Sequence, residues 1–454
     1  MTVASLHARV RLSRLAAHML IAVAMLAARA PWQRLVAQAD EGRRAPVLLG
    51  TVLDAVARSN PRLDAARALA RAARARVPGV TRPPDPQLQF GFMNYELPSL
   101  RPMETIGMTQ LQLMQMVPVA GKLRLAGAVA TARADAASTR IADAGLDLRV
   151  RTAMSFYDLY AVDGALRVAM ETRRLLQDIA VIADRMYQVG EGRQADVLRA
   201  NVELARMQEE IVRMQTMRTT MQARLNALLV LPADTPVGAP QLPIFPVSPS
   251  TLDSLTGLAE RNRPVLLAGA QDVEVANASV ELARREIWPD LQLGVQYGQQ
   301  RGLMGPQRMG SLMIGAALPI FAKSRQLQMR DEANAMRAMA AADLASMRTE
   351  TRGAVAESYA NVLRARRLAD LYRTSVLPQA EASVTSSRAA YRVSAVPFMT
   401  LLDAQMTLNR YRQELFTLES DEGKAWAELE MLTGRVLIDS YTAQPVRPAG
   451  EPPK

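Results

Sequence analysis

The chain has 454 residues, a formal net charge of +11 and no cysteine, and its two histidines are His7 and His18. Because both histidines lie in the N-terminal leader described below, the rest of the chain can build no disulfide, thiolate nucleophile, imidazole base or His/Cys metal site. This composition argues against an enzyme, and we predict no catalytic residue, no cofactor and no resident metal.

Residues 1–39 have the layout of an export signal. They contain five arginines and no acidic residue, an apolar stretch from Leu15 to Ala28, and the small-residue ending Ala37-Gln38-Ala39. This stretch is shorter than the ~20 residues that a membrane-spanning helix requires. We therefore predict a cleaved signal peptide, with an uncleaved amphipathic helix as the alternative, and no lipid attached through an N-terminal cysteine.

The remaining charge does not form a basic stripe. Removal of the five leader arginines lowers the 55 basic residues to 50, against 44 acidic residues, so the net charge falls to +6. Basic and acidic residues alternate along the chain, for example between Arg199 and Glu210, as on a solvated helix surface. We predict no nucleic-acid partner.

The first half of the mature chain, 40–231, predicts a helix, a strand hairpin and two long helices. Residues 52–76 have helical spacing with a break at Asn60-Pro61, and Leu88, Phe90 and Phe92 alternate with polar or small residues, as in strands. We predict a hairpin over 86–117, a helix over 122–187, a short tip and a return helix over 194–229. A helix of some 65 residues is a rod of roughly 100 Å.

Six prolines between Pro232 and Pro249 mark a linker, 232–250, to which we assign no regular structure. The second half, 251–440, predicts a helix over 252–287 that breaks at Arg263-Pro264, a hairpin over 290–318, a long helix over 323–391 and a return helix over 398–433. The chain ends in a Pro-rich tail, 441–454.

The two halves are copies of one module. Pro264 lies 203 residues after Pro61, residues 289–294 match residues 86–91, and Lys323 matches Lys122. A period this long is one large unit and not a short solenoid repeat. Each copy contributes two strands, so we predict four strands in all.

Four strands leave two open sheet edges, and a sheet in lipid must close because each unpaired backbone group there costs several kcal/mol. Spanning barrels begin at about eight strands, so at least two chains must cooperate, and three would supply twelve strands. The alternative is a soluble helical protein that carries two small hairpins.

The chain resembles the TolC family of outer-membrane efflux factors in three features. These are the double occurrence of the elements above, the strand-to-helix step Val117-Pro118-Val119-Ala120-Gly121-Lys122, and the segment from Val393 to Ala404. The resemblance covers nearly the whole mature chain. It implies a mixed membrane fold: a homotrimer whose twelve strands form one β-barrel in outer-membrane lipid and whose long helices form a periplasmic α-barrel. It also implies docking to a periplasmic adaptor and an inner-membrane pump of the RND type.

The resemblance further implies a periplasmic gate of aspartates just after the second tip. Asp403 matches the second aspartate of the family pattern Asp-Val-Leu-Asp-Ala, and Thr400 stands where the first would be. In the first copy Asp196 and Arg199 take these places, so a pairing of Asp403 with Arg199 between the hairpins is a further hypothesis. The alternative is ordinary surface charge near helix starts, where the dipole favours aspartate.

Small residues occupy both helix-hairpin tips, namely Gly190 and Gly192 in the first and Ser394 and Ala395 in the second. They would allow a partner hairpin to dock closely, so we predict an adaptor-docking surface there. Turn geometry is the competing explanation.

Methionines gather around the first predicted hairpin, at Met93, Met103, Met108, Met114 and Met116. Thioethers suit copper(I) and silver(I), and residues 93–122 resemble the heavy-metal branch of the family, although methionine is also ordinary core filler. We predict an efflux channel for copper, silver or other heavy-metal ions. A multidrug or type I secretion channel is the alternative, and a periplasmic coiled-coil adaptor would lack the duplication.

Overall fold

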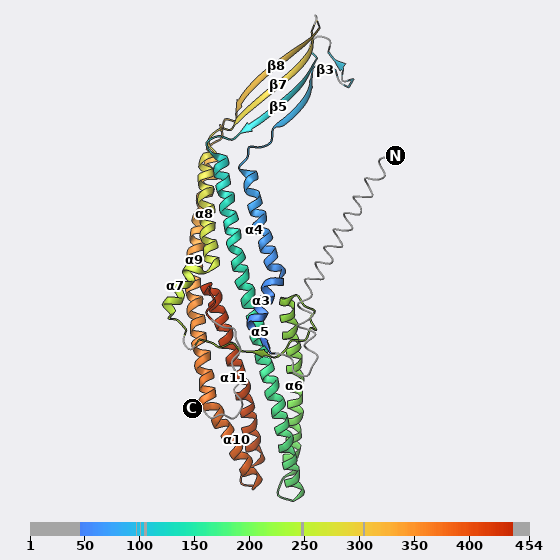
Figure 1. The fold of residues 1–454 in the computed structure, drawn as a ribbon, viewed down its shortest axis with the longest axis vertical. Coiled ribbons are helices and arrows are strands. Elements are labelled where there is room, and N and C mark those ends of the chain that lie inside the picture. Colours follow the sequence, from blue (N-terminus) through green and yellow to red (C-terminus); the bar gives the residue numbers. More distant parts are fainter. Residues whose placement is uncertain are drawn as a thin grey trace.

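The computed structural model describes residues 46–96, 98–99, 101–103, 107–246, 249–302 and 305–438. The predicted leader (1–39) and tail (441–454) lie outside these residues. The molecule is elongated, with a β-sheet at one end, two helix hairpins at the other and long helices between them (Figure 1). None of the helices in the described ranges has the length and apolar content needed to cross a membrane.

The sheet has four antiparallel strands in the order β2, β5, β7, β8. These are β2 (Gln87–Met93) and β5 (Met108–Val117) from the first half, and β7 (Leu291–Gly302) and β8 (Gly305–Ala316) from the second. The central pair joins the two halves, with Val117 opposite Leu291 and Met108 opposite Gln300. Between β2 and β5 the chain forms a small ribbon of β3 (Tyr95–Glu96) and β4 (Arg101–Pro102). Strands β2 and β8 therefore carry the free edges of the sheet.

The two halves each supply a long helix hairpin. In the first half, α5 (Lys122–Gln188) runs for 67 residues and returns as α6 (Gln194–Leu229). In the second half, α9 (Gln326–Leu371) leads through a π-helical turn, η2 (Tyr372–Val376), into α10 (Leu377–Arg392), and the chain returns as α11 (Phe398–Thr433).

The predicted long helix over 323–391 differs from the observed segment at its start and near Pro378. Its first residues form successive turns, in which the Leu327 amide donates to the Ala322 carbonyl, and the helix begins at Gln326. The π-helical turn lies just before Pro378, which has no amide hydrogen to donate and whose ring crowds the carbonyl four residues earlier. A wider turn accommodates both effects without ending the helix.

Proline divides the shorter helices at the expected places. Pro61 begins α4 (Pro61–Val80) after α3 (Leu49–Ser59), and the Asn60 side chain accepts a hydrogen bond from the Arg62 amide. Pro264 likewise begins α8 (Pro264–Arg285) after α7 (Leu252–Asn262). Proline is favoured at a first helical position because its missing amide hydrogen would have no partner there. Below the sheet, α5 packs against α4 and α8, and α8 packs against α9.

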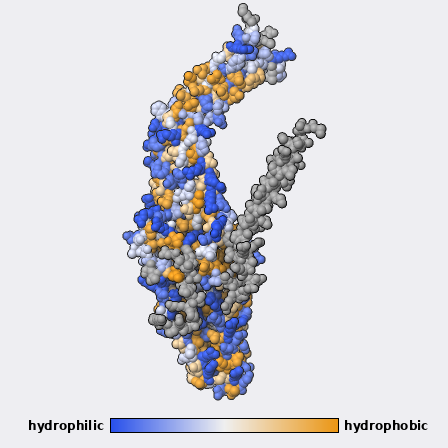
Figure 2. Space-filling model, viewed as in Figure 1, coloured by the Kyte–Doolittle hydropathy of each residue, from blue (hydrophilic) through white to orange (hydrophobic). Residues whose placement is uncertain are grey.

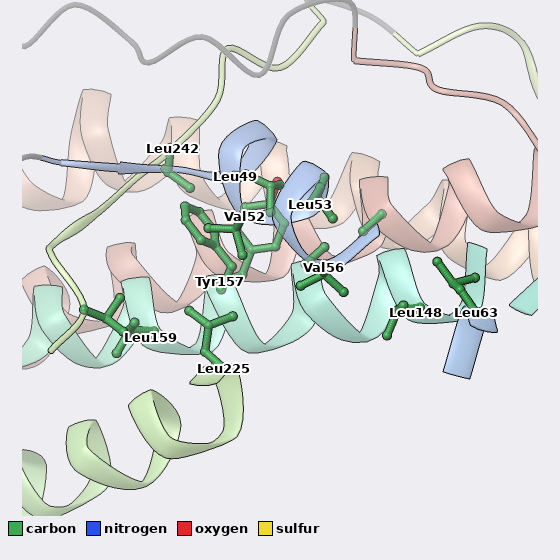
Figure 3. Close-up of a cluster of buried hydrophobic side chains, with 14 residues drawn as sticks. Leu49, Val52, Leu53, Val56, Leu63, Leu148, Tyr157, Leu159, Leu225 and Leu242 are labelled. Carbon is green, nitrogen blue, oxygen red and sulfur yellow. The ribbon is translucent and has the colours of Figure 1, made fainter. Parts of the chain in front are cut away.

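Two of the apolar cores hold the long helices together. At mid-length, Leu49, Val52 and Leu53 of α3 face Tyr157 of α5 and Leu225 of α6 (Figure 3). In the linker, for which we expected no regular structure, β6 (Pro240–Gln241) pairs in parallel with β1 (Val47–Leu48) beside this core. Nearer the tips, residues of α5, α6, α10 and α11 share a second core, so both hairpins form one packed unit.

Candidate functional site

One face of the four-stranded sheet is apolar and exposed. The alternation of side chains and the strand register place ten large apolar residues together on this face: Leu88, Phe90, Phe92, Leu111, Leu113, Leu293, Val295, Tyr297, Leu312 and Ile314. All ten are exposed, and Figure 2 shows apolar side chains gathered over the sheet. A continuous apolar surface of this kind marks contact with lipid or protein.

The opposite face of the sheet has a different chemistry. Its positions in the paired strands are filled by glutamine, glycine, methionine and one serine, and none of these residues is charged. Strands with lipid on one side and a water-filled interior on the other show this alternation. Within the described part of the chain, no cluster of three or more histidine, cysteine, aspartate or glutamate residues could hold a metal ion.

A buried lysine joins the sheet to the helices. The Lys122 ammonium, whose side chain is 8% exposed, donates to the Trp288 carbonyl at 2.8 Å and to Asp290 Oδ1 at 2.9 Å, with Glu286 Oε2 at 3.6 Å. Lys122 begins α5 after the short turn that follows β5, and its acceptors lie between α8 and β7. The contact therefore ties the start of α5 to the segment that leads into β7, where the two sequence halves meet.

The predicted gate residues lie at the starts of the return helices. Asp196 is half-buried in the first turn of α6, whereas Arg199, Thr400 and Asp403 are exposed. Within the described structure, none of the four side chains makes a hydrogen bond or ion pair. The expected pairing of Asp403 with Arg199 is thus not formed in the single chain, where both side chains are solvated.

Tyr391 is a residue of this region that we did not predict. It comes from α10, packs edge-on against Phe398 with ring centroids 5.7 Å apart, and belongs to the core shared by the two hairpins. Its hydroxyl is buried and makes no hydrogen bond to any described residue. Burial, and secondarily the negative charge of Asp196, raise the pKa of the Tyr391 phenol. Tyr391 is therefore part of the packing that joins the second hairpin to the first.

Turn geometry accounts for most of the small tip residues. Gly190 and Ser394 have positive φ angles of 80° and 57°, and a Cβ on Gly192 would lie 2.8 Å from the Tyr187 nitrogen. The exposed Ala395 amide donates to the Ala390 carbonyl. The prediction of the docking surface did not include the valine that precedes each tip.

These two valines, Val189 and Val393, are 70% and 74% exposed. Each directly precedes its tip turn, and the pair occupies equivalent positions in the two sequence copies. Both tips therefore present an apolar side chain to solvent at the end of the molecule farthest from the sheet (Figure 1).

Comparison with known proteins agrees with this architecture. The family model for outer membrane efflux proteins matches residues 52–229 and 255–435. The cobalt-zinc-cadmium resistance protein CzcC of Cupriavidus metallidurans is 24% identical over 304 residues, which cover 64% of this chain and 68% of that protein.

Solved structures show the same fold. The CusC channel matches with a TM-score of 0.73 at 17% identity, covering 86% of this chain and 93% of its own. The open-state MtrE outer membrane channel of Neisseria gonorrhoeae matches with a TM-score of 0.72 at 16% identity, covering 87% and 91%. The chain therefore belongs to the outer membrane efflux protein family and is an outer-membrane channel component of an efflux system.

Proposed function

We propose that three copies of the chain close a twelve-stranded barrel in the outer membrane, and that their long helices continue it as a tunnel through the periplasm. The observation that carries the proposal is the sheet, which exposes ten large apolar side chains on one face and leaves β2 and β8 unpaired at its edges. Lipid tolerates such a sheet only when its edges are paired.

The internal repeat supports a specific contact between copies. Lys122 follows β5 and reaches Asp290, which precedes the neighbouring strand β7. Lys323, the repeat counterpart of Lys122, follows the edge strand β8; the counterpart of Asp290 is Gln87, and the carboxylate just before it is Asp85, at the start of the other edge strand, β2. Both Lys323 and Asp85 are exposed, and neither has an ion-pair partner in the described part of the chain. We expect Lys323 to pair with Asp85 of the next copy when β8 meets β2.

Crosslinking tests both the closure and the contact. The chain contains no cysteine, so a D85C/K323C double variant treated with a short bis-maleimide should form a covalent trimer without background. The single variants D85C and K323C are the controls and should remain uncrosslinked. If the untreated protein is monomeric in mild detergent, barrel closure is wrong; if it is trimeric but the double variant does not crosslink, only the pairing is wrong.

The proposed cargo is a metal ion, delivered by a periplasmic adaptor and an inner-membrane pump of the RND type. Support comes from the relative named for cobalt, zinc and cadmium resistance and from the methionines of the sheet. Deletion of the gene should lower tolerance to one or more of copper, silver, cobalt, zinc and cadmium. Lost tolerance to dyes or detergents alone would instead favour a multidrug channel.

The proposed gate lies at the helix tips, where Asp403, Thr400, Asp196 and Arg199 surround the start of the return helices and Tyr391 couples the hairpins. Both D403A and Y391A should raise the ion conductance of the reconstituted trimer, since the first removes a carboxylate of the proposed gate and the second removes a ring packed between the hairpins. R224A, on α6 away from the tips, is the control. Conductance that is unchanged in both variants would remove this region from the gate.

Docking of the adaptor is proposed at the tips, through Val189 and Val393 with the small residues Gly190, Gly192, Ser394 and Ala395 around them. Exposed apolar side chains at the distal end offer apolar surface that a partner hairpin can bury on binding. V189D/V393D should weaken adaptor binding in a pull-down while the trimer remains intact. Undiminished binding would place the docking surface elsewhere.

A further inference from the structure

The uncharged face of the sheet carries six methionines, namely Met93, Met108, Met114, Met116, Met309 and Met313. They come from three strands and from both sequence halves. In the proposed barrel this face lines the interior, because the opposite face carries the large apolar residues that lipid requires. Any role of these methionines inside the channel therefore rests on the proposed function.

Two of these methionines lean over one glycine. Gly294 of β7 lies opposite Met114 of β5 on one side and Met313 of β8 on the other. A Cβ at Gly294 would lie 3.3 Å from Met313 Cε and 3.5 Å from Met114 Cγ. Because glycine has no side chain, the two thioether side chains occupy the space above it from both sides.

A second group lies nearer the far end of the sheet. Gly298 lies opposite Met309, and a Cβ at Gly298 would lie 3.0 Å from Met108 Sδ. Met108 in turn lies directly opposite Met93 of β2. Met108 thus lies over Gly298, Met309 lies on the next strand, and Met93 lies on the far side of Met108, so the two methionine groups follow one another along the strands.

Core packing does not explain these side chains. They lie on a sheet face that no helix covers (Figure 1), and Met93 and Met309 are among the exposed residues. Their neighbours in the register include Gln110, Gln292 and Gln296, which supply amides but no charge. Hard divalent cations prefer carboxylate oxygens, whereas uncharged thioethers select soft monovalent copper(I) or silver(I).

We propose that the two methionine groups, Met114 with Met313 and Met93 with Met108 and Met309, are successive binding sites for copper(I) or silver(I) as cargo of the channel. Two or three thioethers without a charged ligand bind such an ion weakly enough for release. Conduction requires sites that an ion can both enter and leave, and successive weak sites meet this condition. No redox step is involved, since the ion is bound and released in one oxidation state.

The test is equilibrium binding of silver(I), which needs no reductant, to the purified trimer in detergent. Leucine keeps nearly the same volume as methionine, so M108L/M114L/M309L/M313L preserves packing while removing four sulfurs. The matched control is M329L/M336L/M339L on α9, whose three methionines are also exposed. We expect the sheet variant to lose at least about tenfold in affinity, or about 1.4 kcal/mol, and the α9 variant to bind as the wild type does.

X-ray absorption at the silver edge should show sulfur ligands in the wild type that disappear in the sheet variant. Equal silver affinity in the wild type and the sheet variant, or nitrogen and oxygen ligands alone, would overturn the proposal. The proposed function has a separate test: it is wrong if the wild-type protein forms no trimer in mild detergent. Trimer yield is therefore measured first for every variant.

Discussion

The assignment of lipid and interior faces makes a sharp prediction at two adjacent residues of β8. Leu312 lies on the apolar face opposite Val295, and Ser311 lies on the uncharged polar face opposite Gln296. The substitution L312R should prevent barrel assembly, whereas S311R should leave it intact. The two arginines differ by one position in the chain and by the side of the sheet to which they point.

The free-energy cost of L312R depends on where Leu312 lies. Its side chain is 73% exposed, so no packing contact within the chain compensates for a change there. It sits in the central part of a strand that runs from Gly305 to Ala316, which the proposed barrel places near the middle of the bilayer. Arginine at the midplane on the lipid face of a barrel costs about 2–4 kcal/mol per copy, and the proposed trimer contains three copies. The same side chain at position 311 would extend into the water of the proposed barrel interior and cost little.

The assay is the yield of heat-sensitive trimer in outer-membrane fractions, followed by urea unfolding of the trimers that form. L312R should give little trimer, or trimer that unfolds at clearly lower urea, and S311R should match the wild type. L312M, which keeps an apolar side chain, controls for loss of leucine shape. Equal yields of L312R and S311R would refute the two-face assignment and with it the location of the methionine groups inside the channel.

Two further predictions concern buried charges in the helical part. K122M removes the cation that pairs with Asp290 and Glu286. We expect a loss of about 3 kcal/mol in free energy of unfolding, measured as a lower urea midpoint. K122R should retain part of the lost stability. Glu422 is buried beside Arg366, and burial raises the pKa of its carboxyl. A raised carboxyl pKa means that the folded state disfavours the ion at neutral pH, so E422Q should be the more stable protein at pH 8, and its advantage should shrink as the pH falls through the raised pKa. A difference in free energy of unfolding between E422Q and the wild type that stays constant across pH would contradict the Glu422 prediction. A urea midpoint of K122M equal to that of the wild type would contradict the Lys122 prediction.

The ends of the α11 helix could be predicted from the sequence because local chemistry sets them. The α11 helix begins after Pro397 and ends before Gly434, whose φ is +67°, so both boundaries come from residues with restricted or unusual backbone preferences. The break at Asn60-Pro61 has the same origin. The π-helical turn at Tyr372–Val376 was missed because a proline in a long helix predicts disturbance but not its form.

The site was only partly predictable. Alternation along each strand indicates which residues share a face, but the meeting of Met114, Gly294 and Met313 depends on the register of three strands from two halves of the chain. Tyr391 was missed for a related reason. Its burial and its closeness to Asp196 arise from packing between two hairpins that lie far apart in the sequence.

The two lysines show how duplication couples folding to assembly. Lys122 and Lys323 hold equivalent places in the repeat, yet one is buried among acceptors and the other is exposed. The difference exists because the contact of Lys122 is made within the chain, between β5 and β7, whereas β8 is an edge strand that gains a second neighbour only in the proposed trimer. A free twelve-residue edge beside an apolar face is prone to aberrant pairing. The sheet is therefore expected to reach its stable form only as copies join, with the contact within each chain orienting the edges that must meet.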